Sequence, residues 1–179
     1  MAMARQKLAV LSGVSFVLGT AGALPAHAET APKAPKNAWV VNCATSPASQ
    51  DLKCQMVQNL TDRKSGKTIL RAVVRPAPKA ENTSGFSMLL ALPHGLSLPY
   101  GARYSIDGAT TVTLPIQTSD PNGVYAAFPL TDKTLGALRA GAVMKVMLQN
   151  VQRKPFSMNI SLNGFTAATR KMSRLQQEG

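Results

Sequence analysis

The chain has 179 residues, a formal net charge of +12 at pH 7, and only 5% aromatic residues. Its lysines and arginines are spread along the sequence and never form a block of five or six like charges, which nucleic-acid-binding tails usually contain. The few aromatic side chains also disfavour a stacking platform for single strands. Nucleic acid is therefore not an expected partner.

The N-terminus has the three parts of a secretory signal peptide. Arg5 and Lys7 precede an uncharged apolar stretch over 8–24, and Ala26-His27-Ala28 is a small-x-small cleavage signal. A transmembrane anchor is the alternative, but the stretch is shorter than the roughly 20 residues that a spanning helix needs. We therefore predict a signal peptide over 1–28, a periplasmic or secreted location, and no transmembrane segment after cleavage. The mature chain would keep a charge of about +10.

A short Pro/Lys linker is predicted over 29–36, followed by one domain over 37–179. Cys43 and Cys54 are the only cysteines. In an oxidising compartment, an isolated pair at this spacing favours an intramolecular disulfide. Zinc is not expected, because His94 is the one histidine of the mature chain and further ligands are missing. We predict no metal and no cofactor.

The domain is mostly built from short segments with period-two alternation, which indicates β-strands. Trp39, Val41 and Cys43 are expected on one face of the first strand, and Cys54, Met56 and Gln58 on one face of the second. Further strands are predicted over 67–75, 86–92, 102–106, 110–117, 124–128, 143–150 and 156–163.

Asp107-Gly108 separates two of these strands and favours a type I′ turn, because both residues tolerate positive φ angles. Pro115 has no N–H to donate, so its strand is expected at an edge or with a bulge. A short helix is predicted over 131–139, capped by Thr131 or Asp132.

Phe165, Ala168, Met172 and Leu175 fall at helical spacing and predict an amphipathic helix at the C-terminus. The predicted fold is mainly β: a single-domain antiparallel β-sandwich of about eight or nine strands, with one short internal helix and this C-terminal helix.

The sequence has no recognisable catalytic constellation. Ser65-Gly66-Lys67-Thr68 ends like a P-loop, but Thr61 stands where that motif needs its first glycine. His94 lies beside Pro93 and Gly95, as turn residues do, and no G-x-S-x-G nucleophile motif is present. The acidic residues are scattered singly. We predict a non-enzymatic protein; a hydrolase of envelope polymers, with a site assembled by folding, is the alternative.

The basic charge has two interpretations: it keeps the protein soluble, or it attracts an anionic envelope component. If the charge attracts an anionic component, the candidate contacts are basic residues in the loop before the third strand and basic residues on the terminal helix. These residues are Arg63, Lys64, Lys67, Arg170, Lys171 and Arg174.

Several weak motifs occur in a familiar order. They are Trp39-Val40-Val41-x-Cys43, Cys54-x-Met56, Leu92-Pro93-x-Gly95-Leu96-x-Leu98, Gly101-x-x-Tyr104-x-Ile106-Asp107 and Leu162-x-Gly164-Phe165-x-x-Ala168. In this order after a signal peptide, the sequence resembles the invasion-associated locus B family of bacterial envelope proteins. The resemblance covers nearly all of the mature chain. It implies a β-rich, secreted or periplasmic protein without a known enzymatic activity.

The chain departs from that family at one point. Relatives often carry a second cysteine pair, but Gly123-Val124 stands here where a Gly-Cys would be, and Thr118-Ser119 replaces the other partner. Many relatives also occur in bacteria that do not invade cells. The expected role is therefore an exported, non-enzymatic protein of envelope or host-cell interactions, whose partner is an unidentified protein or an anionic envelope component.

Overall fold

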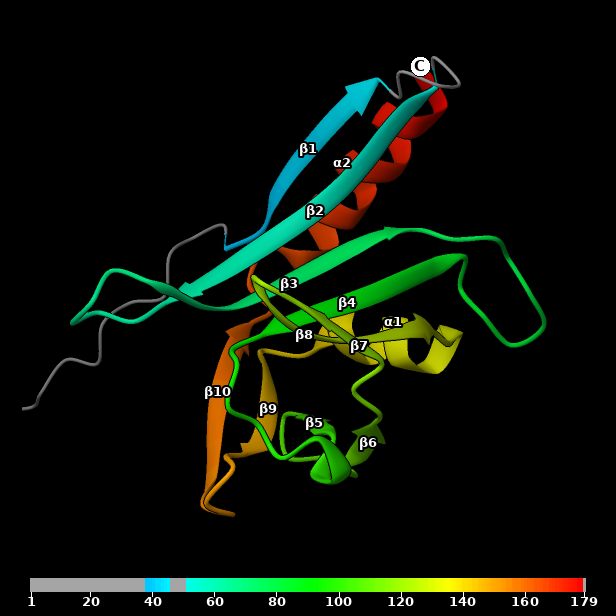
Figure 1. The fold of residues 1–179 in the computed structure, drawn as a ribbon. Helices are drawn as coiled ribbons and strands as arrows, with labels where there is room; N and C mark the ends of the chain where they lie inside the picture. The colour runs from blue at the N-terminus through cyan, green and yellow to red at the C-terminus, as the bar shows by residue number, and fades with distance from the viewer. Residues whose placement is uncertain (1–37, 46–50, 179) are drawn as a thin grey trace, which may run out of the picture. The chain divides into compact units, whose positions relative to one another are not determined.

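The computed structural model describes residues 38–45 and 51–178, all within one compact unit, Lys33–Gly179. The predicted signal peptide over 1–28 and the linker over 29–36 lie outside the described residues. In the described part, ten strands form two antiparallel sheets, accompanied by two α-helices and one 3₁₀ turn (Figure 1). The predicted mainly-β, two-layer fold with one internal and one C-terminal helix is confirmed.

The larger sheet has six strands in the order β1-β2-β3-β4-β8-β7. Their bounds are β1 (Val40–Thr45), β2 (Leu52–Thr61), β3 (Thr68–Pro76), β4 (Phe86–Leu92), β8 (Gly123–Leu130) and β7 (Thr118–Asp120). The first four strands follow one another as hairpins, so most of this sheet is made from neighbouring parts of the chain.

The smaller sheet has four strands in the order β10-β9-β5-β6. Their bounds are β10 (Pro155–Ser161), β9 (Val143–Gln149), β5 (Ala102–Ile106) and β6 (Val112–Leu114). The β5–β6 turn has φ angles of 46° at Asp107 and 77° at Gly108, as the predicted type I′ turn requires. The short 3₁₀ turn, η1 (Leu98–Tyr100), precedes β5.

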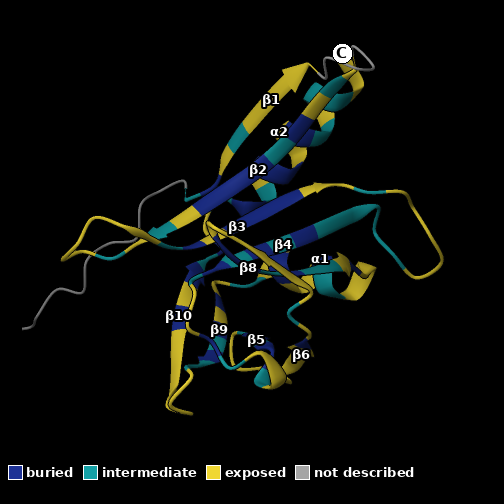
Figure 2. Ribbon diagram, viewed as in Figure 1, coloured by how far each residue is buried: buried dark blue, intermediate teal, exposed yellow. Residues whose placement is uncertain are grey.

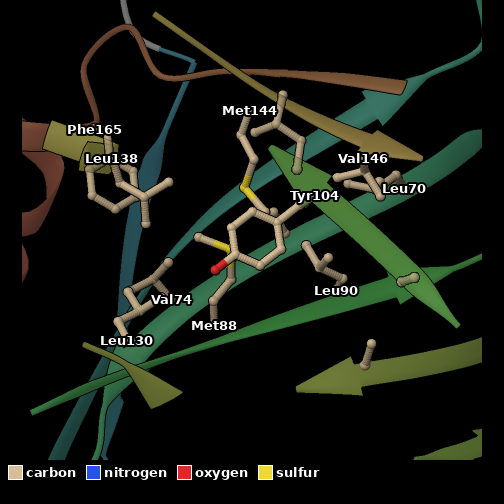
Figure 3. Close-up of a cluster of buried hydrophobic side chains, with 14 of the residues drawn as sticks. Leu70, Val74, Met88, Leu90, Tyr104, Leu130, Leu138, Met144, Val146 and Phe165 are labelled. Carbon is tan, nitrogen blue, oxygen red and sulfur yellow. The ribbon is translucent and has the colours of Figure 1, made fainter. Parts of the chain in front are cut away.

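The inner faces of the two sheets supply the core. Met88 and Leu90 from the larger sheet meet Met144 and Val146 from the smaller one around Tyr104 (Figure 3). The Tyr104 ring stacks on Phe128 with centroids 5.1 Å apart. Every second residue of each strand points into this space, as expected for a sandwich.

Helix α2 (Phe165–Glu178) covers the inner face of the larger sheet at β1 and β2. Its buried residues are Phe165, Ala168, Thr169 and Met172, so three of the four predicted apolar positions are fully covered and Leu175 is half-buried. Trp39 meets the Phe165 ring edge-on at 5.1 Å. Thr169 was not predicted inside; its hydroxyl donates to the Phe165 carbonyl at 2.8 Å, which satisfies it there.

Helix α1 (Asp132–Ala140) begins after Thr131, whose side chain accepts from the Thr134 N–H at 3.0 Å. Thr131, rather than Asp132, is therefore the N-cap. The helix ends before Gly141, and its buried residues are Leu135 and Leu138, as the sequence spacing predicts.

The predicted strand over 110–117 is only partly right: β6 is limited to Val112–Leu114, residues 115–117 belong to no strand, and β7 is a separate strand that begins at Thr118. This additional strand brings the number in the described residues to ten, against the predicted eight or nine. The chain forms β6 in the smaller sheet, leaves it after Leu114, and then forms β7 in the larger sheet. Pro115 lies at the point of departure, where a residue without an N–H interrupts no ladder. The predicted edge position of this strand is confirmed, since β6 ends the four-stranded sheet.

Candidate binding face

The predicted disulfide between Cys43 and Cys54 is present. The two residues are register partners on β1 and β2, with Cα atoms 4.0 Å apart, which is within the reach of a disulfide. Cys43 is exposed and Cys54 is buried. The bond ties the edge strand of the larger sheet to its neighbour.

The six predicted anionic-surface contacts are all exposed, but the fold does not gather them. Arg63, Lys64 and Lys67 lie in the turn between β2 and β3, and Arg170, Lys171 and Arg174 lie on α2. The C-terminal part of α2 packs beside the opposite end of β2, where Gln176 accepts from the Cys54 N–H at 2.9 Å. Because β2 has ten residues, about 30 Å separates its two ends.

His94 is exposed, and its Nε2 lies 3.3 Å from the carbonyl oxygen of Pro121, which accepts the hydrogen bond. Among the hydrogen bonds of the described residues, none joins this ring to a hydroxyl or a carboxylate. Within the same residues, no three His, Cys, Asp or Glu side chains are placed to hold a metal ion. No helix in the described part of the chain is long and apolar enough to cross a membrane.

The larger sheet has an outer face that turns away from the core. Side chains alternate along a strand, so Leu70, Ala72 and Val74 of β3 point into the core, and Arg71, Val73 and Arg75 point outward. Figure 2 shows β3 buried along its middle, and Val73 is the outward-pointing residue that is buried there.

An apolar row crosses this outer face. Register pairs Val57 of β2 with Val73 of β3, Val73 with Leu89 of β4, and Leu89 with Ala127 of β8. Val57 and Val73 are only 5% and 6% exposed, yet neither belongs to the central core cluster. The row is therefore closely covered by its neighbours at Val57 and Val73 and half-buried at Leu89 and Ala127.

The two arginines of β3 stand on either side of this row. Arg71 and Arg75 are exposed and flank Val73 along the strand. The single ion pair among the described residues is Arg174–Glu178, at 3.9 Å, so neither arginine has a carboxylate partner there. Two unpaired guanidinium groups beside apolar surface favour an anionic ligand with an apolar part.

An open groove of about 520 Å³ lies over this face. Its lining includes Arg71, Val73, Arg75, Leu89, Ala91 and Tyr125. A second groove of the same volume begins beside it, and the two share Gln55 and Arg75. The adjoining groove adds Asn42 and Lys53, so the combined depression continues across β2 to β1.

Asp120 is held by hydrogen bonds from two residues that line this groove, Tyr125 and Asn122. The Tyr125 hydroxyl donates to its carboxylate at 2.8 Å, and the Asn122 N–H donates to it at 2.7 Å. These bonds, the tyrosine's first, hold the pKa of Asp120 below its ordinary value. The carboxylate raises the pKa of Tyr125 in return, so at neutral pH the groove presents a neutral phenol.

Sequence reasoning did not single out Arg71, Arg75 or Tyr125. The alternation of Arg71 and Arg75 with apolar residues was a usable signal for a charged outward face. The apolar row was not readable in the same way, because it depends on the register of four strands, and register is set by tertiary packing.

Comparison with known proteins agrees with this architecture. The family model described as invasion associated locus B (IalB) protein matches residues 39–173. The crystal structure of invasion associated protein b from Bartonella henselae is similar with a TM-score of 0.69 and 22% identity, covering 80% of this chain and 95% of that chain. At this identity, the likeness establishes the fold. No curated protein matches. Since the family match runs from Trp39 into α2, the chain belongs to the invasion associated locus B family.

Proposed function

We propose that this is an exported, non-enzymatic protein that works by binding another envelope or host-cell component through the outer face of its six-stranded sheet. The observation that carries the proposal is the apolar row between two arginines that have no carboxylate partner among the described residues. Arginine is enriched in binding faces relative to the rest of a protein surface, and here two exposed arginines lie beside the half-buried side chain of Leu89.

Other features support an extracytoplasmic role. The Cys43–Cys54 disulfide is of the kind that persists in oxidising compartments. The family match and the signal-peptide pattern over 1–28 point to the same place. Periplasm and medium are both compatible with this proposal.

Position-specific crosslinking tests the proposed role. A photoreactive p-benzoylphenylalanine at Tyr125 would report on the outer face, in cells that export the protein. The matched position is Asn159, an exposed residue of β10 that points away from the core between Met158 and Ile160. We expect a discrete crosslinked product from Tyr125 and none from Asn159. The same products from both positions, or none from either, would contradict a binding role for this face.

A further inference from the structure

The spacing between Arg71 and Arg75 matches the spacing of side chains on one side of an extended peptide. Arg71 and Arg75 are four residues apart on one strand, which places their Cα atoms about 13 Å apart, with Val73 midway. An extended peptide presents every second side chain to one side with the same rise per residue. Its residues i, i+2 and i+4 would therefore face Arg71, Val73 and Arg75 in turn.

The positive charge of Arg71 and Arg75 determines which residues the ligand peptide needs at positions i and i+4. Neither arginine is paired with a carboxylate among the described residues, and Asp120 at the β7 edge is held by Tyr125 and Asn122. Carboxylates on the ligand would meet guanidinium groups that offer paired N–H donors. The position between them would meet Leu89 and Ala91, which are half-buried in the lining beside Val73, so it calls for an apolar side chain.

A bilayer surface fits this face less well than a peptide does. The face is a hollow of about 520 Å³ with Arg71 and Arg75 in its lining, and a flat surface does not fill a hollow. A single side chain of a bound peptide can enter it and meet Leu89 and Ala91, which are half-buried. The continuation of the depression past Gln55 to Lys53 also provides length for a ligand chain.

The ligand segment is not part of this chain. Its eight acidic residues include no two that are four positions apart, so the sequence contains no acidic–x–apolar–x–acidic segment. Resting on the binding role proposed above, we infer that the groove over β3 binds an extended segment of another protein with acidic residues at i and i+4 and an apolar residue at i+2.

A titration followed by NMR tests this inference. The probe is a synthetic peptide with the core Glu-Thr-Leu-Thr-Glu, added to the isotopically labelled protein at low salt. We expect amide shifts to concentrate in β3, β4 and β8. A peptide of the same composition with its two glutamates adjacent should bind about tenfold more weakly, because it loses one charge-assisted contact.

Substitutions of the two arginines test whether they contact the peptide. Arg71→Gln and Arg75→Gln should each weaken peptide binding about tenfold, whereas Arg71→Lys should lose less, since it keeps charge without the guanidinium fork. Arg139→Gln, on the exposed face of α1, is the charge-matched control and should leave affinity unchanged. The folding of each variant is checked by its own spectrum.

Three results would overturn the inference: equal affinity for both peptides, unchanged affinity in Arg71→Gln and Arg75→Gln, or shifts centred outside the groove. Arginine-dependent binding to vesicles of anionic lipid, without binding to the peptide, would assign the face to a membrane instead. If the peptide fails while the crosslink from Tyr125 persists, the binding role stands and the acidic peptide class falls.

Discussion

Gly123 and Gly136 differ in the space that is available for an added side chain. A Cβ atom added to Gly123, at the start of β8, would meet the Leu92 carbonyl oxygen of the paired strand, whereas one added to Gly136 in α1 would meet nothing within 4 Å. We expect Gly123→Ala to destabilise the fold by more than about 1 kcal/mol, because two paired strands must move apart.

Gly136→Ala is the matched control and should stabilise the protein by about 0.5–1 kcal/mol, since alanine restricts the unfolded chain and favours helix. Equilibrium unfolding in urea measures both changes. A loss of stability in Gly136→Ala, or no loss in Gly123→Ala, would contradict the packing described for these two positions.

The Tyr125–Asp120 hydrogen bond predicts a pH response. A carboxylate with a lowered pKa contributes its stabilisation fully above its ordinary pKa and loses it as the pH falls through the lowered value. We therefore expect Asp120 to titrate below the ordinary aspartate value of 3.8 and Tyr125→Phe to raise its pKa toward that value. NMR titration of the side-chain carboxyl signals measures the change.

Asp62 provides an internal control for that titration. Its pKa is also lowered, mainly by the Ser65 hydroxyl, which donates to it at 2.7 Å in the β2–β3 turn. It should titrate identically in the native protein and in Tyr125→Phe. An Asp120 pKa that does not respond to removal of the phenol would show that the bond does not form in solution.

At the scale of the element, the disulfide is expected to be structural. It closes a short loop with a sequence separation of 11 and joins β1 to β2. Replacing both cysteines with serine should lower the free energy of unfolding by about 2–5 kcal/mol, because the unfolded chain regains the freedom that the loop removed. Urea unfolding of the native and double-serine proteins measures it.

The crosslink from Tyr125 provides the second readout for the double-serine protein. It should persist, because Tyr125 lines the groove over β3, whereas Cys43 and Cys54 line only the adjoining groove. Full stability combined with a lost crosslink would instead indicate that the disulfide has a redox role.

Elements with a strong local signal were predictable from the sequence. The run over 86–92 forms β4 with the predicted bounds, and the Thr131 cap starts α1, because alternation and capping are properties of neighbouring residues. The end of β6 and the start of β7 were not predictable, since alternation continues to Ile116 although β6 ends at Leu114 and β7 begins at Thr118 in the other sheet. Only tertiary pairing decides where the chain leaves one sheet and joins the other.

The candidate site shows the same division. The exposed cations of the β2–β3 turn and α2 were predictable as exposed charges, but their separation along β2 was not. The binding face itself needs Val57, Val73, Leu89 and Ala127, from four strands, in one register row. No local pattern specifies such a row, because each strand contributes a single residue to it.

At the scale of the whole molecule, the dispersed charge predicts weak attraction to membranes. Exposed charges are screened over about 8 Å at physiological ionic strength. Thr169, next to Arg170, contacts Met56, which lies about 17 Å along β2 from the Thr61 end, where the turn cations follow. The turn cations and the helix cations should act independently. We expect co-sedimentation with anionic vesicles at low salt only, and none with neutral vesicles.

A protein with Arg170, Lys171 and Arg174 replaced by glutamine is the variant for this experiment. It should lose part of the low-salt binding and keep the part due to the turn cations. Equal binding to both vesicle types, or no binding at low salt, would leave the cations of the turn and of α2 with solubility as their only role. Binding to anionic vesicles that persists at physiological salt would contradict independent action.

The contacts between the two ends of the domain have a consequence for how the chain is made. Trp39 donates to the Ser161 carbonyl, and Gln176 accepts from Cys54, and each bond joins residues 122 positions apart. A chain that emerges from its N-terminus must therefore hold its first hairpin uncovered until the last helix arrives. A product that stops before Phe165 would expose Met56 and Cys54 on that hairpin and would be a candidate for proteolysis or aggregation. The 14 residues of α2 thus distinguish a finished chain from an interrupted one.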